Sequence, residues 1–148
     1  MSTRIRLVVV IALAIACIVT GCTRQFTVRV EESGAPLTGA QAERLAAETD
    51  ISPLASVSSN DAVAMRATVL SELRTRGALG IRAADLLTIG FPERTSAVPV
   101  LVRASSVDGA SAVVVIEAFG SAGEMLVHRR LWVFDRTTGA VLRAASIR

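Results

Sequence analysis

The spacing of hydrophobic residues changes partway along the chain. Between residues 59 and 73, apolar residues recur at intervals of three and four, which predicts an amphipathic helix with Ser59 or Asn60 as its N-cap. From residue 96 onward the interval becomes two, and clusters of turn residues separate four predicted strands. These strands span residues 97–105, 110–119, 124–135 and 140–147. The short turns between them predict an antiparallel meander.

The segment before the first long helix predicts one more strand and one more helix. Residues 25–31 alternate between apolar and polar side chains, as in a half-buried strand. Thr38 and Gln41 have the spacing of a capping box, so a helix is expected to begin there. A third, short helix is expected over residues 81–89.

Together these elements predict a single α+β domain over residues 26–148. An N-terminal strand and two or three helices would pack on a C-terminal four-stranded antiparallel meander. At the level of architecture alone, this arrangement resembles the cystatin and NTF2-type folds. A likeness of architecture implies no function.

Turn lengths predict the strand register and thereby assign side chains to the two faces of the sheet. The expected register places Val100 opposite Ile116, Ile116 opposite Val127, and Val133 opposite Leu142. The face expected to receive the helices carries Val98, Val100, Val102, Val114, Ile116, Val127, Leu131, Val133 and Leu142, interrupted by Arg129.

Arg129 lies on this predicted helix-facing side and needs a partner. A buried guanidinium without an acceptor is costly. Glu72 and Asp85, from the predicted helices, are the expected acidic partners.

The opposite face is the predicted partner-binding surface. Its candidate residues are Trp132, Arg130, Arg143, Phe134, Leu126, Glu117 and His128. Trp and Arg often dominate the binding energy of protein interfaces, and the expected register places Trp132 opposite Arg143. The alternative is that the first strand or first helix covers this face and buries its apolar part.

The first 22 residues carry a targeting pattern. Arg4 and Arg6 precede thirteen consecutive apolar residues at positions 7–19, and Val19-Thr20-Gly21-Cys22 follows. Thirteen residues are short for a membrane-spanning helix, which needs about 20, and suit the core of a signal peptide. The tetrapeptide resembles the lipobox of bacterial lipoproteins. An uncleaved short anchor helix is the alternative.

The lipobox resemblance implies a mature chain with a lipid anchor. Residues 1–21 would be removed as the signal peptide, Cys22 would carry a diacylglyceryl thioether and be acylated, and residues 22–25 would form a short lipidated tether. Two acyl chains hold a protein on a membrane far more firmly than one. The implied location is the extracytoplasmic side of the cell envelope, on the plasma membrane or, in a Gram-negative bacterium, the outer membrane.

Composition excludes several kinds of chemistry for such a mature chain. Its only cysteine would be the acylated Cys22, so thiol catalysis and disulfides are excluded. Loss of Arg4 and Arg6 lowers the net charge from +3 to +1, which disfavours nucleic acid as a partner. A single histidine, His128, cannot supply the ligands of a zinc site, and no cofactor motif is present.

We therefore expect a non-enzymatic envelope lipoprotein that binds or helps to assemble another protein. The alternative is a carrier or sensor of an apolar small molecule held between the helices and the sheet. A hydrolase that uses Glu117 and His128 is a third and weaker interpretation, because no nucleophile accompanies them. Oligomeric state does not follow from the sequence.

Overall fold

The computed structural model describes residues 26–91 and 95–148. The predicted signal peptide (1–21), Cys22 and the remainder of the tether up to residue 25 lie outside the described residues. In the part that is described, no helix is long and apolar enough to cross a membrane.

The described chain contains three α-helices, a 3₁₀ turn and a five-stranded sheet, which confirms the α+β class. The elements in chain order are β1 (Arg29–Glu31), α2 (Gly39–Glu48), η1 (Ser52–Leu54), α3 (Ser59–Leu73), α4 (Gly77–Ile89), β2 (Ala97–Val107), β3 (Ala110–Phe119), β4 (His128–Asp135) and β5 (Val141–Ile147). The predicted first strand is reduced to the three residues of β1, which pair with β2 in parallel.

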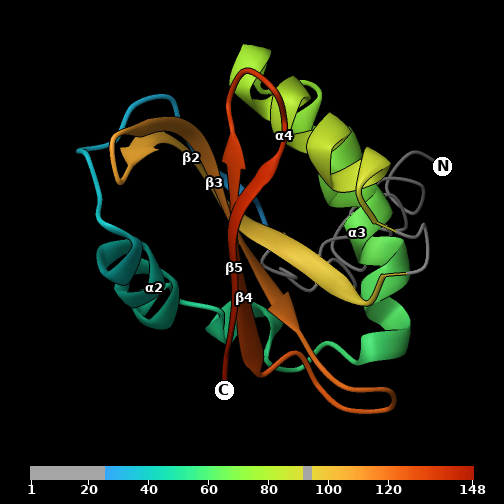
Figure 1. Cartoon of the computed structure of the whole chain (residues 1–148). Coiled ribbons are helices and arrows are strands. Elements are labelled where there is room, and N and C mark those ends of the chain that lie inside the picture. The colour runs from blue at the N-terminus through green and yellow to red at the C-terminus, as the bar shows by residue number, and fades with distance from the viewer. Residues whose placement is uncertain (1–25, 92–94) are drawn as a thin grey trace, which may run out of the picture.

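The sheet forms the middle of three layers. Its strand order is β1-β2-β3-β4-β5, and every pair after the first is antiparallel. Figure 1 views the sheet nearly edge-on, with α2 on one side and α3 and α4 on the other. Helices therefore cover both faces of the sheet.

Side-chain caps explain where the first two helices begin. Thr38 accepts from the backbone N–H of Gln41, whose side chain accepts from the N–H of Thr38, so the predicted capping box is present. The predicted N-cap of α3 is wrong by one residue, since Ser58 accepts from the N–H of Asp61. The hydroxyl of Ser59 is not free to cap, because it accepts from the N–H of Gly123 at 2.8 Å.

The predicted register between β2 and β3 is wrong by one residue over most of the pair. Asp108 and Gly109 form a two-residue turn with φ of 49° and 85°, so Val107, and not Ser106, pairs with Ala110. Positive φ at both central positions is typical of a type I′ turn. As a result Leu101 faces Ile116 in place of Val100.

The register between β3 and β4 differs from the predicted one by four residues. Ile116 pairs with Leu131 and not with Val127, because the loop at residues 120–127 does not form a tight hairpin. This loop binds the segment before α3 instead: the N–H of Ser59 donates to Glu124 O, and the N–H of Leu126 donates to Val57 O. An even shift leaves the side chains within β3 and β4 on their predicted faces. Val127 lies outside β4 and is 49% exposed, so its predicted place on the helix-facing side is wrong.

The last hairpin begins as predicted and then shifts by one residue. Phe134 pairs with Val141, but an irregularity in the strand places Val133 opposite Arg143 in place of Leu142. The turn is held by Asp135, whose carboxylate accepts from the N–H groups of Thr137 and Thr138. The hydrogen bonds from Thr138 are the main reason why the pKa of Asp135 lies below its usual range.

The two faces are covered by different helices. Among the described α-helices, α2 packs on the face that carries Arg129, whereas α3 and α4 pack on the face that was predicted to bind a partner. The prediction that the helices pack on the Arg129 face is therefore correct for α2 and wrong for α3 and α4. Glu72 and Asp85, the predicted partners of Arg129, are also wrong. The guanidinium Nε of Arg129 donates instead to Thr49 O at 2.8 Å.

Candidate functional site

A chain of buried polar groups crosses from α3 to the sheet. Arg66 donates from one terminal nitrogen to Glu117 Oε1 at 2.5 Å and to Ala97 O at 2.7 Å. The other carboxylate oxygen of Glu117 accepts from the indole N–H of Trp132 at 2.8 Å. Arg66 is 3% exposed and Glu117 is 1% exposed. Such a pair is tolerated in a core because its charges are matched and its hydrogen bonds are made.

The position of Arg66 follows from the helical period, although our sequence analysis missed it. Arg66 lies four residues after Ala62 and three before Val69, so it belongs to the buried stripe of α3. Two features of the sequence could have revealed the pair. Arg66 lies inside an apolar helical stripe, and Glu117 is the one charged residue of β3.

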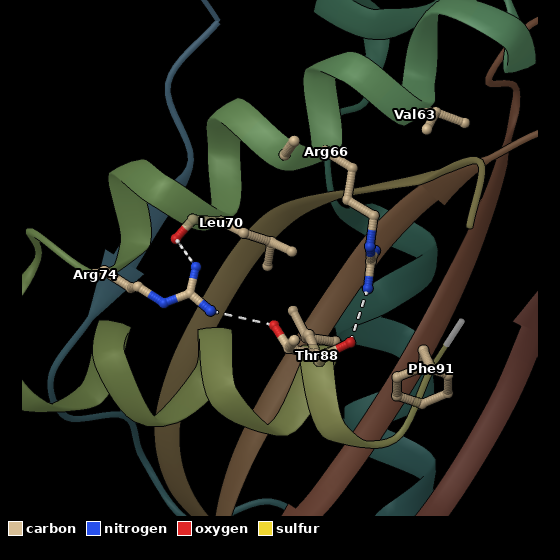
Figure 2. Close-up of a pocket in the computed structure, with 8 residues that line it drawn as sticks. Val63, Arg66, Leu70, Arg74, Thr88 and Phe91 are labelled. Atoms are coloured by element: carbon tan, nitrogen blue, oxygen red, sulfur yellow. Dashed lines mark hydrogen bonds between the residues drawn. The ribbon is translucent and has the colours of Figure 1, made fainter. Parts of the chain in front are cut away.

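A cavity of about 260 Å³ lies between α3 and α4. Apolar side chains line most of it, namely Val63, Ala67, Leu70, Leu87 and Phe91. Figure 2 shows Arg66 and Arg74 extending from α3 toward α4 across this cavity, with Thr88 between their guanidinium groups.

A second feature is a strip of aromatic and arginine side chains on the sheet beside these helices. The ring centroids of Phe91 and Trp132 are 4.4 Å apart, and the Arg130 guanidinium lies 4.4 Å from the ring centre of Phe119. The ring of His128 lies 5.5 Å from that of Phe119. All five side chains are partly exposed, and we call them the aromatic strip.

β5 pairs with β4, the strand that carries Trp132, Arg130 and His128, and the other edge of β5 is open. β5 is the last strand of the sheet, and among the described residues no other strand pairs with its outer edge. Val141 and Leu142 are 51% and 47% exposed. An uncovered edge presents unpaired backbone N–H and C=O groups to another extended chain.

The predicted partner-binding residues fall into three groups. Trp132, Arg130 and His128 are partly exposed and lie together in the aromatic strip. Leu126, Phe134 and Glu117 are buried, so they do not form an exposed face. The alternative, that the first strand or first helix covers this face, is wrong: β1 pairs with the edge of β2, and α2 packs on the opposite face. The helices on this side of the sheet are α3 and α4.

Arg143 lies on the face opposite to the aromatic strip, and its predicted contact with Trp132 is wrong. Trp132 pairs with Ala144, because the irregularity in β5 rotates Arg143 to the α2 side. There the guanidinium of Arg143 binds the carboxylate of Glu43 at 2.9 Å.

The groups considered for catalysis do not act on one another. Glu117 lies diagonally from His128 on the sheet, as expected, but both of its carboxylate oxygens are occupied by Arg66 and Trp132. His128 Nδ1 is buried and has no hydrogen-bond partner among the described residues. In residues 26–91 and 95–148, no three His, Cys, Asp or Glu residues are grouped so as to hold a metal ion.

No protein-family model, curated protein or solved structure matches the chain.

Proposed function

We propose that this protein is a non-enzymatic lipoprotein of the cell envelope that binds an extended segment of another envelope protein along β5. The observation that carries the proposal is the open edge of β5 beside the aromatic strip. The lipid anchor at Cys22 is proposed from the lipobox alone.

The edge and the strip suit one extended peptide. Strand addition to an open sheet edge uses backbone hydrogen bonds for affinity, and neighbouring side-chain contacts for specificity. Trp132 and Arg130 are partly exposed on the adjacent strand β4. Val141 and Leu142 are exposed at the start of β5 itself. Trp and Arg are the side chains most often found at interface hot spots.

The orientation of Trp132 is well defined in this arrangement. Its indole N–H donates to Glu117, and its ring packs against Phe91. A side chain held in this way loses little conformational entropy when a partner binds. This supports a role for Trp132 as an anchor for the bound segment.

The lipid anchor is tested by substitution of each cysteine. In cells fed an alkyne-bearing fatty acid, we expect the wild-type protein and Cys17→Ala to be labelled, because Cys17 lies inside the predicted signal peptide. Cys22→Ala is expected to lose the label and to retain its signal peptide. Labelling is read by in-gel fluorescence and cleavage by intact mass. Persistent labelling of Cys22→Ala would contradict the proposed anchor.

The binding surface is tested by photo-crosslinking in cells. A photoreactive amino acid at Leu142 is expected to give a discrete adduct with another protein, whereas the same amino acid at Ala64 is not. Ala64 is the control because it is exposed on α3, which packs on β2, three strands away from β5. Arg130→Gln should weaken the Leu142 adduct while leaving expression unchanged.

Two results would count against this surface. Equal adducts at Leu142 and Ala64 would indicate random encounter. An adduct of twice the mass of the chain would indicate that the β5 edge joins two copies and not a different protein.

A further inference from the structure

We infer that the cavity between α3 and α4 binds a small molecule that carries a carboxylate on a short apolar body. The cavity is distinct from the open edge of β5, although Phe91 belongs both to the cavity lining and to the aromatic strip.

The apolar part of the site is formed by both helices. Val63, Ala67 and Leu70 come from α3 and Leu87 from α4, with Phe91 just beyond the end of α4. Apolar walls with a few polar groups are typical of small-molecule sites. The polar groups here are Arg66, Arg74 and Thr88.

The charge of the lining favours an anion. It includes two arginines and no carboxylate. Glu117 neutralises Arg66 from outside the cavity, but the nearest carboxylate to Arg74 is that of Asp85 at 3.9 Å, with both side chains nearly half exposed. Arg74 thus brings a positive charge to the cavity that is only weakly compensated.

The hydrogen bonds of Arg74 are long enough to be exchanged for a better acceptor. It donates to Leu70 O at 3.5 Å, which is longer than the usual range of about 2.7–3.2 Å, and to the hydroxyl of Thr88 at 3.2 Å, which is at the upper end of that range. A carboxylate could replace both with shorter, charge-assisted bonds, because guanidinium and carboxylate match as a pair of parallel hydrogen bonds. Figure 2 shows Arg74 and Thr88 facing each other at one end of the cavity.

The volume limits the size of the ligand. A cavity of about 260 Å³ lies just below the range of roughly 300–1,000 Å³ that is typical of sites for drug-sized ligands. A small ligand such as a six-carbon fatty acid or a simple aromatic acid therefore suits it.

Trp132 can report on the cavity. It is the only tryptophan, and the chain has no tyrosine. Its ring packs against Phe91, which lines the cavity, and its indole N–H shares Glu117 with Arg66, which also lines it. A ligand that contacts Phe91 or Arg66 is therefore expected to change the fluorescence of Trp132.

The test is a titration of the full chain in phosphatidylcholine vesicles with hexanoate, followed by Trp132 fluorescence. We expect a change that saturates below about 50 mM. 1-Hexanol, which has the same apolar body without the charge, should bind at least about five-fold more weakly. Arg74→Gln should weaken hexanoate binding about five-fold, whereas Arg82→Gln on the other side of α4 should change it by less than about two-fold.

A second variant separates this cavity from other apolar regions. Ala67→Phe places a ring in the cavity from an exposed helix position, so it should abolish the signal while the protein keeps its thermal unfolding transition. No saturable signal in the wild-type chain would overturn the proposal, as would equal affinity for hexanol or full binding by folded Ala67→Phe.

Discussion

Replacing Glu117 with Gln is expected to lower the free energy of unfolding by about 3–5 kcal/mol. The substitution preserves the shape of the side chain but leaves the Arg66 guanidinium buried without its counter-charge. The two carboxylate oxygens of Glu117 accept hydrogen bonds from Arg66 and Trp132, and the glutamine amide has only one oxygen with which to accept them. Thermal unfolding followed by circular dichroism should show a fall in Tm of roughly 10–20 °C for a domain of this size.

Glu43→Gln is the matched control for this prediction. It removes a carboxylate from an exposed ion pair with Arg143, in which both side chains are more than 40% exposed. Exposed pairs contribute about 0–1 kcal/mol, so its Tm should change little. Similar small effects for both variants would mean that the Arg66–Glu117 pair is hydrated and not buried.

The double variant Arg66→Met/Glu117→Leu tests whether the fold needs the two buried charges for its stability. Apolar residues of similar size often replace a buried ion pair without loss of stability. We therefore expect the double variant to be more stable than Glu117→Gln. The opposite result, a double variant less stable than Glu117→Gln, would contradict this. It would show that losing the hydrogen bonds to Ala97 O and from Trp132 costs more free energy of unfolding than removing the buried charges regains.

Local patterns predicted the elements well, because each pattern depends on residues close in the sequence. The alternation from residue 110 to 119 predicts the bounds of β3 without error, and the Thr38–Gln41 capping box locates the start of α2. The register of β4 could not be found in this way. The loop at residues 120–127 is held by Val57 and Ser59, more than 60 residues earlier in the chain.

The candidate site was only partly predictable for a similar reason. Trp132 and Arg130 stand out by residue type, and the structure brings them together with Phe119 and Phe91. Burial of Phe134 depends on which face α3 and α4 cover, and no local pattern decides that. The cavity also depends on how closely these two helices approach each other.

Gly80 on α4 limits that approach, and Gly80→Ala is expected to destabilise the protein by about 2 kcal/mol. A Cβ at this position would lie 2.2 Å from the carbonyl oxygen of Leu73 and 2.9 Å from the Cβ of Arg76. Alanine gains about 1 kcal/mol over glycine from helix propensity. The clash opposes this gain, because backbone atoms cannot rotate away and overpacking costs about 1–3 kcal/mol or more.

Gly90→Ala provides the control for the propensity term. Gly90 has φ of −84° at the end of α4, and its nearest contact for an added Cβ is Leu86 O at 3.3 Å. Urea unfolding should therefore show a near-neutral change for Gly90→Ala and a clear loss for Gly80→Ala. Stabilisation of Gly80→Ala by about 1 kcal/mol would mean that α4 can move away from α3 without cost. The hexanoate affinity of the same variant would then distinguish a rigid cavity from an adjustable one, since any separation of the helices lengthens the distance from Arg74 to Thr88.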